Sequence, residues 1–443
     1  MKQILSISER KAKGKQLRLA LQRGEHAKWT TKKNRDSVLP SVKAATIGRV
    51  PALLPLKMGR MALSALAFYR GSAGLMAEDL STLPVTGLNV QICGDAHVRN
   101  LGAFGTPEGH LVFDLNDFDE TIVGPWEWDL KRLATSFVLA GREAGHGEGG
   151  CQDAVRTLVR SYQKALNTFA EMKVLELAWH QVVRHSQNPV IHAIMSKAEH
   201  VTPKVTLKKL TTKGLDGSPV FHDEPPVLRH VPTKEAQSVI ASLTKYRTIL
   251  SAGRQLIFDS YHPVDVAFKV VGTGSVGTRD FAVLLLGTSK SDALFLQVKE
   301  SVESCYAPFL KHSHSPAHDG QRVAQGQQRI QAFGDPFLGW TTVDEKTYLV
   351  RQLSDHKASV DPTELRGEAL LEYADVCGEV LAKAHARTGD AAVLAGYLGG
   401  SDKVVEAMTG FAASYADQVD EDFATFAKAI KKGIIKAEKI ASK

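Results

Sequence analysis

The chain has 443 residues, of which 43% are hydrophobic and 23% are charged, and this length predicts two or three lobes instead of one simple core. No apolar run reaches the roughly 18 residues that cross a bilayer, and the start has no apolar region of the secretory type, so neither a transmembrane segment nor secretion is expected. The four cysteines form no CxxC pair, which argues against a disulfide framework or a zinc ribbon and predicts a cytoplasmic protein.

The positive charge is concentrated at the start of the chain. Residues 1–60 contain fifteen Lys and Arg against three Asp and Glu, while the whole chain carries only +7. We expect residues 1–52 to form a basic N-terminal arm that is solvated and partly mobile. Such an arm can attract nucleic acid or an anionic surface. It has Trp29 but no interleaved aromatics of the kind that stack bases, so a dedicated nucleic-acid binder is a minor hypothesis.

Residues 53–235 are predicted to form a mainly helical lobe. Apolar residues recur at three- and four-residue spacing from Met58 to Tyr69, as they do on one face of a helix. The stretch 201–235 is rich in Pro, Lys and Thr, which marks the best candidate for a lobe boundary. The other predicted elements of this lobe are two short strands over 88–93 and 110–115, a helix over 126–139, and one long helix or two over 151–184.

Residues 236–358 are predicted to form a β-rich lobe, and residues 359–443 to return to helix. A helix over about 235–253 precedes the strands, and a glutamine-rich helix lies near 320–333. The stretch 423–440 is typical of a basic amphipathic helix that packs on a surface. The expected strands cover 264–271, 281–286, 294–298 and 348–353. Together these elements predict an α+β fold with helical parts on both sides of a small sheet.

Acidic and amide side chains gather after the two strands of the first lobe. Asp95 and Asn100 follow the first strand, and Asp117 follows the second, within a run of six acids from 114 to 129. Carboxylates among apolar neighbours cost several kcal/mol unless they are paired or bound to metal. Asp95 can accept a proton from a hydroxyl nucleophile, while Asn100 and Asp117 can hold Mg²⁺ on a nucleotide. Whether Asp114 caps a turn or joins the site stays open, and Asp129 is expected to cap its helix or brace a neighbouring loop.

A glycine-rich turn lies between two strands of the second lobe. Gly272, Gly274, Ser275 and Gly277 form a GxGxxG, which alone would suggest a dinucleotide fold. A dinucleotide turn opens a helix, however, whereas a strand follows here. A strand–turn–strand hairpin can lay backbone N–H groups over phosphates. Lys299 ends the next strand, and a lysine in that position beside a glycine turn is how protein kinases hold the α- and β-phosphates.

These residues resemble the motifs of aminoglycoside phosphotransferase-type kinases. Gly-Asp-x-His-x-x-Asn from Gly94 resembles their catalytic loop, and Asp117-Phe118-Asp119 resembles their metal-binding segment. Residues 124–130 resemble a later conserved acidic motif. The resemblance implies that Asp95 and His97 belong to the catalytic loop, with His97 bracing that loop more than moving a proton. It also implies that Asn100, Asp117 and Asp119 are metal ligands.

Longer stretches resemble the bacterial family of unknown function numbered twenty-two fifty-two. They lie between about 50 and 415 and include FYRG from Phe68, CGDAHVRNLG from Cys93, FDLNDFDET from Phe113, WEWDLKRLA from Trp126, VGTGSVGTRDF from Val271, VRQLSD from Val350 and AHARTGD from Ala384. Kinases place the glycine turn and lysine before the catalytic loop, and here the order is reversed. The resemblance therefore implies a circularly permuted, two-lobed kinase-like fold, with a small antiparallel β lobe and a larger helical lobe.

The function that these motifs imply is an ATP- and Mg²⁺-dependent phosphotransferase. Lys299 would reach the α- and β-phosphates under the turn Gly272–Gly277, and Asp95 would face the acceptor. The acceptor is a hydroxyl on an unidentified small molecule or protein, and nucleotidyl transfer is the outcome if the nucleotide binds inverted. The alternative is a nucleotide-sensing, pseudokinase-type binding module without turnover, which the missing acidic partner of Lys299 favours.

Several other side chains are weighed against structural roles. His312, His314 and His318 could bind a metal, but a flexible polar loop is the favoured interpretation. His385 and Arg387 could contact phosphate or could cap a helix against Asp390, and both readings stay open. Arg70 and Arg351 are interpreted as partners in structural ion pairs.

Overall fold

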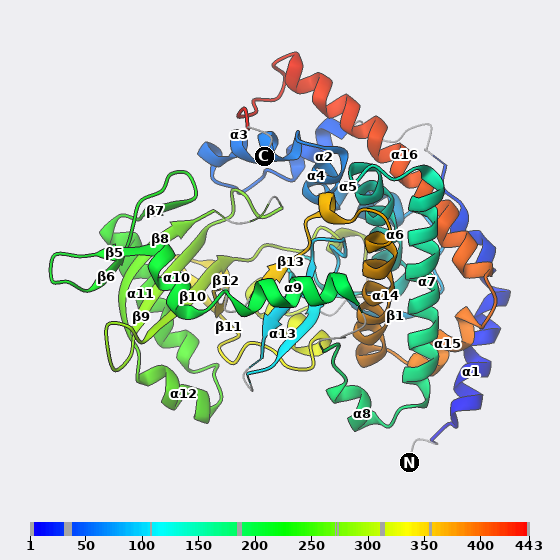
Figure 1. The fold of residues 1–443 in the computed structure, drawn as a ribbon, viewed down its shortest axis with the longest axis horizontal. Helices are drawn as coiled ribbons and strands as arrows, with labels where there is room; N and C mark the ends of the chain where they lie inside the picture. Colours follow the sequence, from blue (N-terminus) through cyan, green and yellow to red (C-terminus); the bar gives the residue numbers. More distant parts are fainter. Residues whose placement is uncertain are drawn as a thin grey trace.

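The largest sheet of the computed structural model has six antiparallel strands in the order β11–β12–β10–β9–β8–β7 (Figure 1). The structure describes residues 4–30, 38–106, 109–183, 188–270, 272, 274–310, 315–353 and 357–440. The strands are β7 (Leu228–His230), β8 (His262–Lys269), β9 (Asp280–Leu286), β10 (Ala293–Glu300), β11 (Gly339–Val343) and β12 (Lys346–Gln352). Figure 1 shows this sheet on one side of the molecule and most of the long helices on the other.

The two faces of the six-stranded sheet pack against different neighbours. Alternate residues of β10 face opposite ways, as the pleat requires. Leu296 and Val298 join a cluster with α11 (Thr233–Arg247), whereas Phe295 packs with Phe221 of the hairpin β5 (Thr211–Lys213) and β6 (Pro219–Phe221). Lys299 shares the face of Phe295, so it leaves the sheet on the side opposite α11. The helices α10 (Pro203–Leu210) and α12 (Ala252–Asp259) complete this part.

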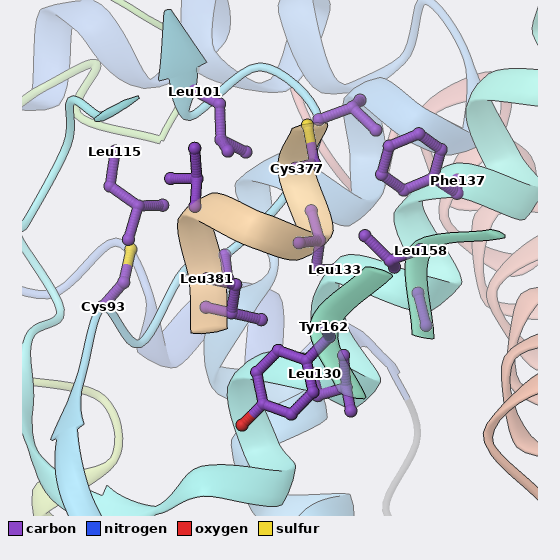
Figure 2. Close-up of a cluster of buried hydrophobic side chains, with 14 of the residues drawn as sticks. Cys93, Leu101, Leu115, Leu130, Leu133, Phe137, Leu158, Tyr162, Cys377 and Leu381 are labelled. Atoms are coloured by element: carbon purple, nitrogen blue, oxygen red, sulfur yellow. The ribbon is translucent and has the colours of Figure 1, made fainter. Parts of the chain in front are cut away.

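The helical body is built around α6 (Trp126–Glu143), α7 (Glu148–Glu171) and α14 (Ala369–Thr388). Figure 2 shows side chains of these three helices meeting Leu101 and Leu115 from short strands in one apolar core. α14 packs along α7 with little separation, because a Cβ on Gly378 would lie only 2.3 Å from the carbonyl oxygen of Leu158. The remaining helices of the body are α8 (Val174–Trp179), α9 (Pro189–Glu199), α15 (Ala391–Leu398) and α16 (Lys403–Lys431).

Two small sheets carry the acidic loops at the boundary of the helical body. β1 (Asn89–Ile92) pairs with β4 (Ile122–Pro125), and β2 (Leu101–Gly105) pairs with β3 (Leu111–Leu115) and β13 (Ala358–Ser359). One acidic loop connects β1 to β2, and the other connects β3 to β4. Helix α13 (Asp319–Ile330) packs on β12 and on α14 and therefore bridges the large sheet and the helical body.

The N-terminal segment packs against the C-terminal helices, so the expectation of a solvated arm is wrong for residues 4–30 and 38–50. α1 (Ile7–Gln16) lies on α15, and Val42 of α2 (Val38–Ala44) is buried in the main core. Arg18 donates to the carbonyl oxygens of Gly396 and Tyr397 in the last turn of α15, at 2.5 and 2.8 Å. Helix C-terminal carbonyls attract cations, so this positive charge has a structural use.

Further along, the segment from Pro51 to Leu80 forms η3 (Pro51–Leu53), α3 (Leu54–Met61), α4 (Ala65–Gly71) and α5 (Ala73–Leu80). α3 packs under the large sheet, where Leu56 joins the same apolar cluster as α11. Residues 434–440 return to this helix, and the amide of Glu438 donates to the carbonyl oxygen of Pro55 at 2.8 Å. A Cβ on Gly59 would lie 2.2 Å from the carbonyl oxygen of Glu438, which shows how closely the two segments pass.

The structure confirms the α+β class and corrects several element boundaries. β2 and β4 were not expected. The stretch 151–184, predicted as one long helix or two, contains two helices, α7 and α8, and α7 already begins at Glu148. The stretch 201–235, the candidate lobe boundary, contains α10, β5, β6 and β7. The helix predicted over 423–440 is the end of α16, which stops at Lys431. None of the helices in the described ranges combines the length and the apolar character that spanning a bilayer would take.

Candidate active site

A cavity of about 790 Å³ lies between the acidic loops, the glycine turn and helices α2, α4 and α5. Asp95, Asp117 and Asp119 of the acidic loops and Gly274 and Ser275 of the glycine turn all line it. Its remaining polar lining comes from Ser41, Arg49, Arg70, Glu78, Glu120, Thr278, Glu300, Ser301, Glu303, Ser304 and Cys305. Residues far apart in the sequence thus meet at one solvent-accessible space.

The loop that carries Asp95 is fixed by its own backbone and by helix α6. Gly94 has a φ of +83°, and a Cβ there would lie 2.4 Å from the carbonyl oxygen of Glu120. The carboxylate of Asp129 accepts the backbone N–H of Cys93 at 2.6 Å and that of Gly94 at 2.9 Å. The prediction that Asp129 braces a neighbouring loop is confirmed. Only a glycine fits at position 94, because both its φ and its surroundings exclude a side chain.

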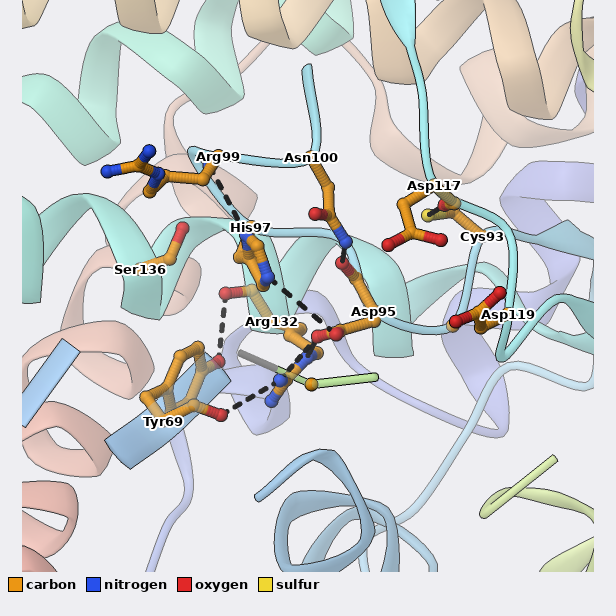
Figure 3. A network of polar contacts seen from close by, with 12 residues as sticks. Tyr69, Cys93, Asp95, His97, Arg99, Asn100, Asp117, Asp119, Arg132 and Ser136 are labelled. Atoms are coloured by element: carbon orange, nitrogen blue, oxygen red, sulfur yellow. Dashed lines mark hydrogen bonds and ion pairs between the residues drawn. The ribbon is translucent and has the colours of Figure 1, made fainter. Parts of the chain in front are cut away.

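Asp95 is paired with Arg132, which the sequence did not single out (Figure 3). Arg132 Nε and Nη2 lie 2.6 and 2.5 Å from Asp95 Oδ1, and the guanidinium is fully buried. The guanidinium also stands over the ring of Tyr69, 4.3 Å from its centroid. Burial raises the pKa of Asp95, while Arg132 acts in the opposite direction. The pairing holds the carboxylate in one orientation, with Oδ2 directed away from the arginine contact.

His97 and Asn100 secure the same loop. The backbone N–H of Arg99 donates to His97 Nδ1 at 3.2 Å, which places the proton of the neutral ring on Nε2. His97 Nε2 lies 3.7 Å from Asp95 Oδ2, and burial holds the pKa of His97 well below its usual range. Asn100 Nδ2 donates to the backbone carbonyl of Asp95 at 2.7 Å. A neutral, inward-facing ring of this kind supports the bracing role expected for His97.

Lys299 meets the second acidic loop. Its Nζ lies 2.5 Å from Asp119 Oδ2 and 3.9 Å from Asp117 Oδ1. Burial lowers the pKa of Lys299, but Asp117 and Asp119 outweigh burial and raise it. Burial and the neighbouring Asp117 raise the pKa of Asp119. The acidic partners of Lys299 are therefore these two residues, which lie 180 and 182 positions away, and not an acid on a nearby helix.

Glu300, the acid next to Lys299 in the sequence, does not pair with it. Glu300 pairs with Arg279 at 3.1 Å and with Lys346 at 3.4 Å. The glutamine-rich helix α13 contributes Arg322, which donates to the carbonyl oxygens of Asp119 and Thr121 at 3.0 and 2.7 Å. The helix therefore supports the backbone of the acidic loop, and it supplies a cation to that loop instead of an acid to Lys299.

Basic residues between positions 49 and 60 donate hydrogen bonds to backbone carbonyls of the glycine turn. Arg49 Nη1 donates to the carbonyl oxygen of Val276 at 2.7 Å, and Lys57 Nζ donates to that of Gly274 at 3.0 Å. Arg60 Nη1 donates to the carbonyl oxygen of Gly272 at 2.5 Å. Gly272 and Gly277 have φ values of +58° and +94°, which favour glycine. Val271 and Thr273 lie outside the described residues.

Two polar atoms at this cavity, one hydrogen-bond acceptor and one donor, have no hydrogen-bond partner in the described chain. Asp117 Oδ1 and Arg70 Nε are both inaccessible to solvent and have no hydrogen-bond partner in the described parts of the chain. Buried polar groups normally have partners, so each such atom calls for a physical explanation. The described residues hold no cluster of three or more His, Cys, Asp or Glu suited to a metal. A cation here would rest on Asp117 and Asp119, with the amide oxygen of Asn100 and groups from a ligand.

The other weighed residues have structural partners. The buried His385 contacts Tyr162 Oη at 2.8 Å and lies 3.5 Å from Asp129. Arg387 donates to backbone carbonyls, including that of Arg329 at 3.2 Å, while Asp390 caps α15. The reading in which they cap the helix against Asp390 is therefore wrong, because Asp390 caps α15 and pairs with Arg10, while contact with phosphate stays a prediction. The remaining outcomes are that Asp114 pairs with Lys383, His318 caps α13, Arg351 donates to Gln297 Oε1 at 2.7 Å, and His312 and His314 lie outside the described residues.

Two functional candidates were missed by sequence reasoning. Arg132 lies inside the stretch from Trp126, and Arg70 lies inside the stretch from Phe68, so both are parts of segments that were recognised. The ion pair expected for Arg70 is not found among the described residues. No local sequence pattern indicates that Arg132 contacts Asp95 or that Arg70 lines the cavity, because both relationships depend on the tertiary fold.

A family described as an uncharacterized protein conserved in bacteria, DUF2252, matches residues 49–429. No curated protein and no solved structure matches the chain. The matched region includes the two acidic loops, the glycine turn, Lys299 and both arginines, Arg70 and Arg132. The whole of the candidate active site, apart from the α2 end of the cavity, therefore lies within the part shared with the family.

Proposed function

This chain belongs to the DUF2252 family, and we propose that it catalyses ATP- and Mg²⁺-dependent phosphoryl transfer to a hydroxyl acceptor. The observation that carries the proposal is the contact of Lys299 with Asp119 and Asp117 beside the cavity that Asp95 also lines. Phosphoryl transfer needs a lysine for the nucleotide phosphates, acids for the metal and an acid at the acceptor. Two distant parts of the chain each bring half of this set to one place.

Asp117 and Asp119, together with the side-chain oxygen of Asn100, are the residues that would hold Mg²⁺. The ion, when bound, neutralises the charge on the phosphates. Mg²⁺ usually takes one or two carboxylates and completes its shell with water and substrate phosphates, so a larger acidic cluster is not needed. The buried Asp117 Oδ1, without a hydrogen-bond partner in the described chain, supports this assignment.

The other residues have distinct roles in the proposed reaction. Asp95 would accept the proton of the acceptor hydroxyl, and Arg132 would keep its carboxylate oriented for that task. Lys299 would bind the α- and β-phosphates as a charged donor. The turn Gly272–Gly277 would cover them, since glycine permits a close approach of backbone to phosphate.

The proposal includes a circularly permuted, kinase-like arrangement of the two parts. The sheet that carries the glycine turn and Lys299 follows the acidic loops along the chain, and the order does not matter to groups that need only converge in space. The pairing of β9 with β10, and the exit of Lys299 on the side of the acidic loops, support this arrangement.

Calorimetric titration of ATP, with and without Mg²⁺, tests the proposal. We expect measurable binding that needs the metal and that weakens strongly in Asp117→Asn, because a charged oxygen ligand is lost. Asp259→Asn is the matched control, since Asp259 is an acid at the surface that pairs with Arg247. Equal affinity with and without Mg²⁺, or an unchanged Asp117→Asn, contradicts the proposal.

The alternative is a nucleotide-binding module without turnover. It wins if the wild type binds ATP, yet transfers no label from γ-labelled ATP to any component of a cell extract and does not hydrolyse ATP. Transfer of label from α-labelled ATP, but not from γ-labelled ATP, would instead identify nucleotidyl transfer to the same kind of acceptor.

The acceptor in this proposal is an unidentified small molecule or protein that carries a hydroxyl group. Contact with nucleic acid or an anionic surface through the N-terminal segment stays a prediction. It is a narrower one than the composition suggests, because Arg10, Lys11 and Arg18 already contact Asp390, Glu171 and the end of α15.

A further inference from the structure

Arg70 lies at the end of α4, and its position is set by buried neighbours. Phe68 and Tyr69 are in the main core, and Tyr69 Oη donates to the carbonyl oxygen of Arg132 at 2.9 Å. Arg132 Nη2 in turn donates to the carbonyl oxygen of Tyr69 at 3.1 Å. The backbone next to Arg70 is therefore tied to the same arginine that holds Asp95, and Arg70 itself lines the cavity.

The guanidinium of Arg70 is short of partners. Its Nε is buried without a hydrogen-bond acceptor in the described chain. Burial and the neighbouring Arg99 lower the pKa of Arg70 to about 10, against the effects of Asp95, Glu143 and Asp117, so it stays charged near neutral pH. Arg70 is partly buried, and a charged donor held away from water without an acceptor is costly. A fork of N–H donors matches the oxygens of a phosphoryl group.

The other arginine that lines the cavity is already engaged. Arg49 donates to the carbonyl oxygens of Ala45 and Val276, both at 2.7 Å. Arg49 is thus fixed to the backbone through Nε and Nη1, whereas Nε of Arg70 has no acceptor among the described residues. Arg70 also has its counterpart in Asp117, whose buried Oδ1 lacks a hydrogen-bond partner in the same cavity. A phosphoryl group carried with a metal ion has anionic oxygens for Arg70 and a cation for Asp117.

We propose that Arg70 is a catalytic residue whose guanidinium binds the oxygens of the phosphoryl group in transfer. This inference rests on the proposed phosphotransferase function. In the step, the acceptor oxygen bonds to the γ-phosphorus, and the bond from that phosphorus to the β,γ-bridging oxygen breaks with its electron pair left on ADP. The acceptor proton passes to Asp95. Arg70 balances the negative charge that the γ-phosphoryl oxygens carry during this exchange.

The test compares Arg70→Gln, Arg70→Lys and the wild type in three measurements. These are the rate of ATP turnover, with water or extract as acceptor, the affinity for ADP with Mg²⁺, and the affinity for ADP with Mg²⁺ and aluminium fluoride, which mimics the group in transfer. Arg156→Gln is the control for the charge change, because Arg156 pairs with Glu406 on an exposed part of α7. Thermal unfolding shows which variants are folded.

We expect Arg70→Gln to lose about 10²–10³-fold in turnover and to lose the extra affinity for ADP with aluminium fluoride. Its affinity for ADP should stay within about two-fold of the wild type, because ADP lacks the transferred group. Arg70→Lys keeps the charge but not the forked donors, so it should retain part of the turnover and part of the extra affinity for ADP with aluminium fluoride. If Arg70→Gln does not fold, Arg70→Lys is the variant that is compared with the wild type.

The outcomes separate this inference from the proposed function. If the wild type binds ATP and turns it over, and Arg70→Gln matches it in turnover and in affinity for ADP with aluminium fluoride, the role of Arg70 is wrong while the function stands. Arg70→Gln could instead lower the affinity for ADP by the same factor as the affinity for ADP with aluminium fluoride. Arg70 would then contact phosphate in general, and the inference would also fail. A wild type that neither binds nor turns over ATP overturns both.

Discussion

Arg132 Nε and Nη2 both lie within 2.6 Å of one oxygen of Asp95, and the arginine has no solvent exposure. The pair joins the middle of α6 to the loop after β1, so the helix that forms the core also aims the acid at the cavity. A buried ion pair of this kind contributes less to stability than to geometry, because desolvation offsets much of the attraction. The contribution of this ion pair is therefore best measured by replacing one of its partners.

Replacing only Arg132 leaves the largely buried carboxylate of Asp95, whose side chain is 18% exposed, without its cationic partner. We expect Arg132→Met to lower the free energy of unfolding by about 3–5 kcal/mol in urea titrations at pH 7. The loss should be larger at pH 8 than at pH 5, because removal of Arg132 raises the pKa of Asp95 further and the cost applies only to the ionised form. Asp95→Asn in the same chain should restore much of the stability. Arg160→Met, which breaks the exposed pair with Asp402, should cost less than about 1 kcal/mol.

Asp95 and Lys299 should fail in different ways when they are replaced. Asp95→Ala is expected to leave ATP affinity almost unchanged and to reduce transfer by about 10²–10⁴-fold, because Asp95 faces the acceptor. Lys299→Ala is expected to weaken ATP affinity itself, since it removes a charged contact to phosphate. A binding titration run beside a transfer assay measures both. Identical losses of affinity in the two variants would count against separate roles.

Asp280 should make stability depend on pH. It stands opposite Lys299 in the pairing of β9 with β10. Burial raises the pKa of Asp280 to about 7, although Lys299 and a hydrogen bond from Gln297 act the other way. The unfolded value is about 3.9. A carboxyl with a higher pKa in the folded state costs stability above pH 7, and this cost disappears as the pH falls from about 7 to about 4.

We therefore expect Asp280→Asn to raise the melting temperature at pH 8 and to leave it unchanged near pH 4. Asp259→Asn is the control with the opposite sign, because a hydrogen bond from Arg247 lowers the pKa of Asp259. Melting curves at the two pH values decide the matter. A destabilised Asp280→Asn at pH 8 would show that the ionised carboxylate contributes favourably to the sheet.

Gly94 and Gly109 form a matched pair for testing the loop before Asp95. Their φ values are +83° and +81°, so an alanine is strained at either position. Only at Gly94 would the new Cβ meet a neighbour, the carbonyl oxygen of Glu120 at 2.4 Å, whereas nothing lies within 4 Å at Gly109. Gly109→Ala should cost about 1–2 kcal/mol of unfolding free energy, and Gly94→Ala distinctly more. Equal costs would mean that the two acidic loops can separate freely.

The sequence predicts the parts of this site better than their meeting. Strand ends followed by acids, and a glycine turn followed by a strand, are local patterns, and β1, β3, β9 and β10 lie where those patterns indicate. The contact of Lys299 with Asp119 joins residues 180 positions apart, and no periodicity within either strand encodes it. Lys299 points to the same face of β10 as Phe295. The sequence alone does not show that this face is the one toward the acidic loops.

The N-terminal segment shows a different limit of sequence reasoning. A dense run of Lys and Arg is typical of a solvated arm, because charged side chains are costly to bury. Arg18 avoids that cost by donating to carbonyl oxygens at the end of α15. Those carbonyls belong to a helix near the other end of the chain, and composition counts charges without showing such acceptors.

The glycine turn accepts hydrogen bonds from Arg49, Lys57 and Arg60. These contacts bear on the order in which the site can form during synthesis. α3 carries two of these residues and is itself lined by residues 434–440 through the hydrogen bond from Glu438 to Pro55. A ribosome delivers the turn long before it delivers Glu438. A nascent chain that already displays both acidic loops and Lys299 would therefore still lack the packing that steadies α3. Full packing of α3 therefore waits until residues 434–440 have been synthesised, after both acidic loops and Lys299 have been made.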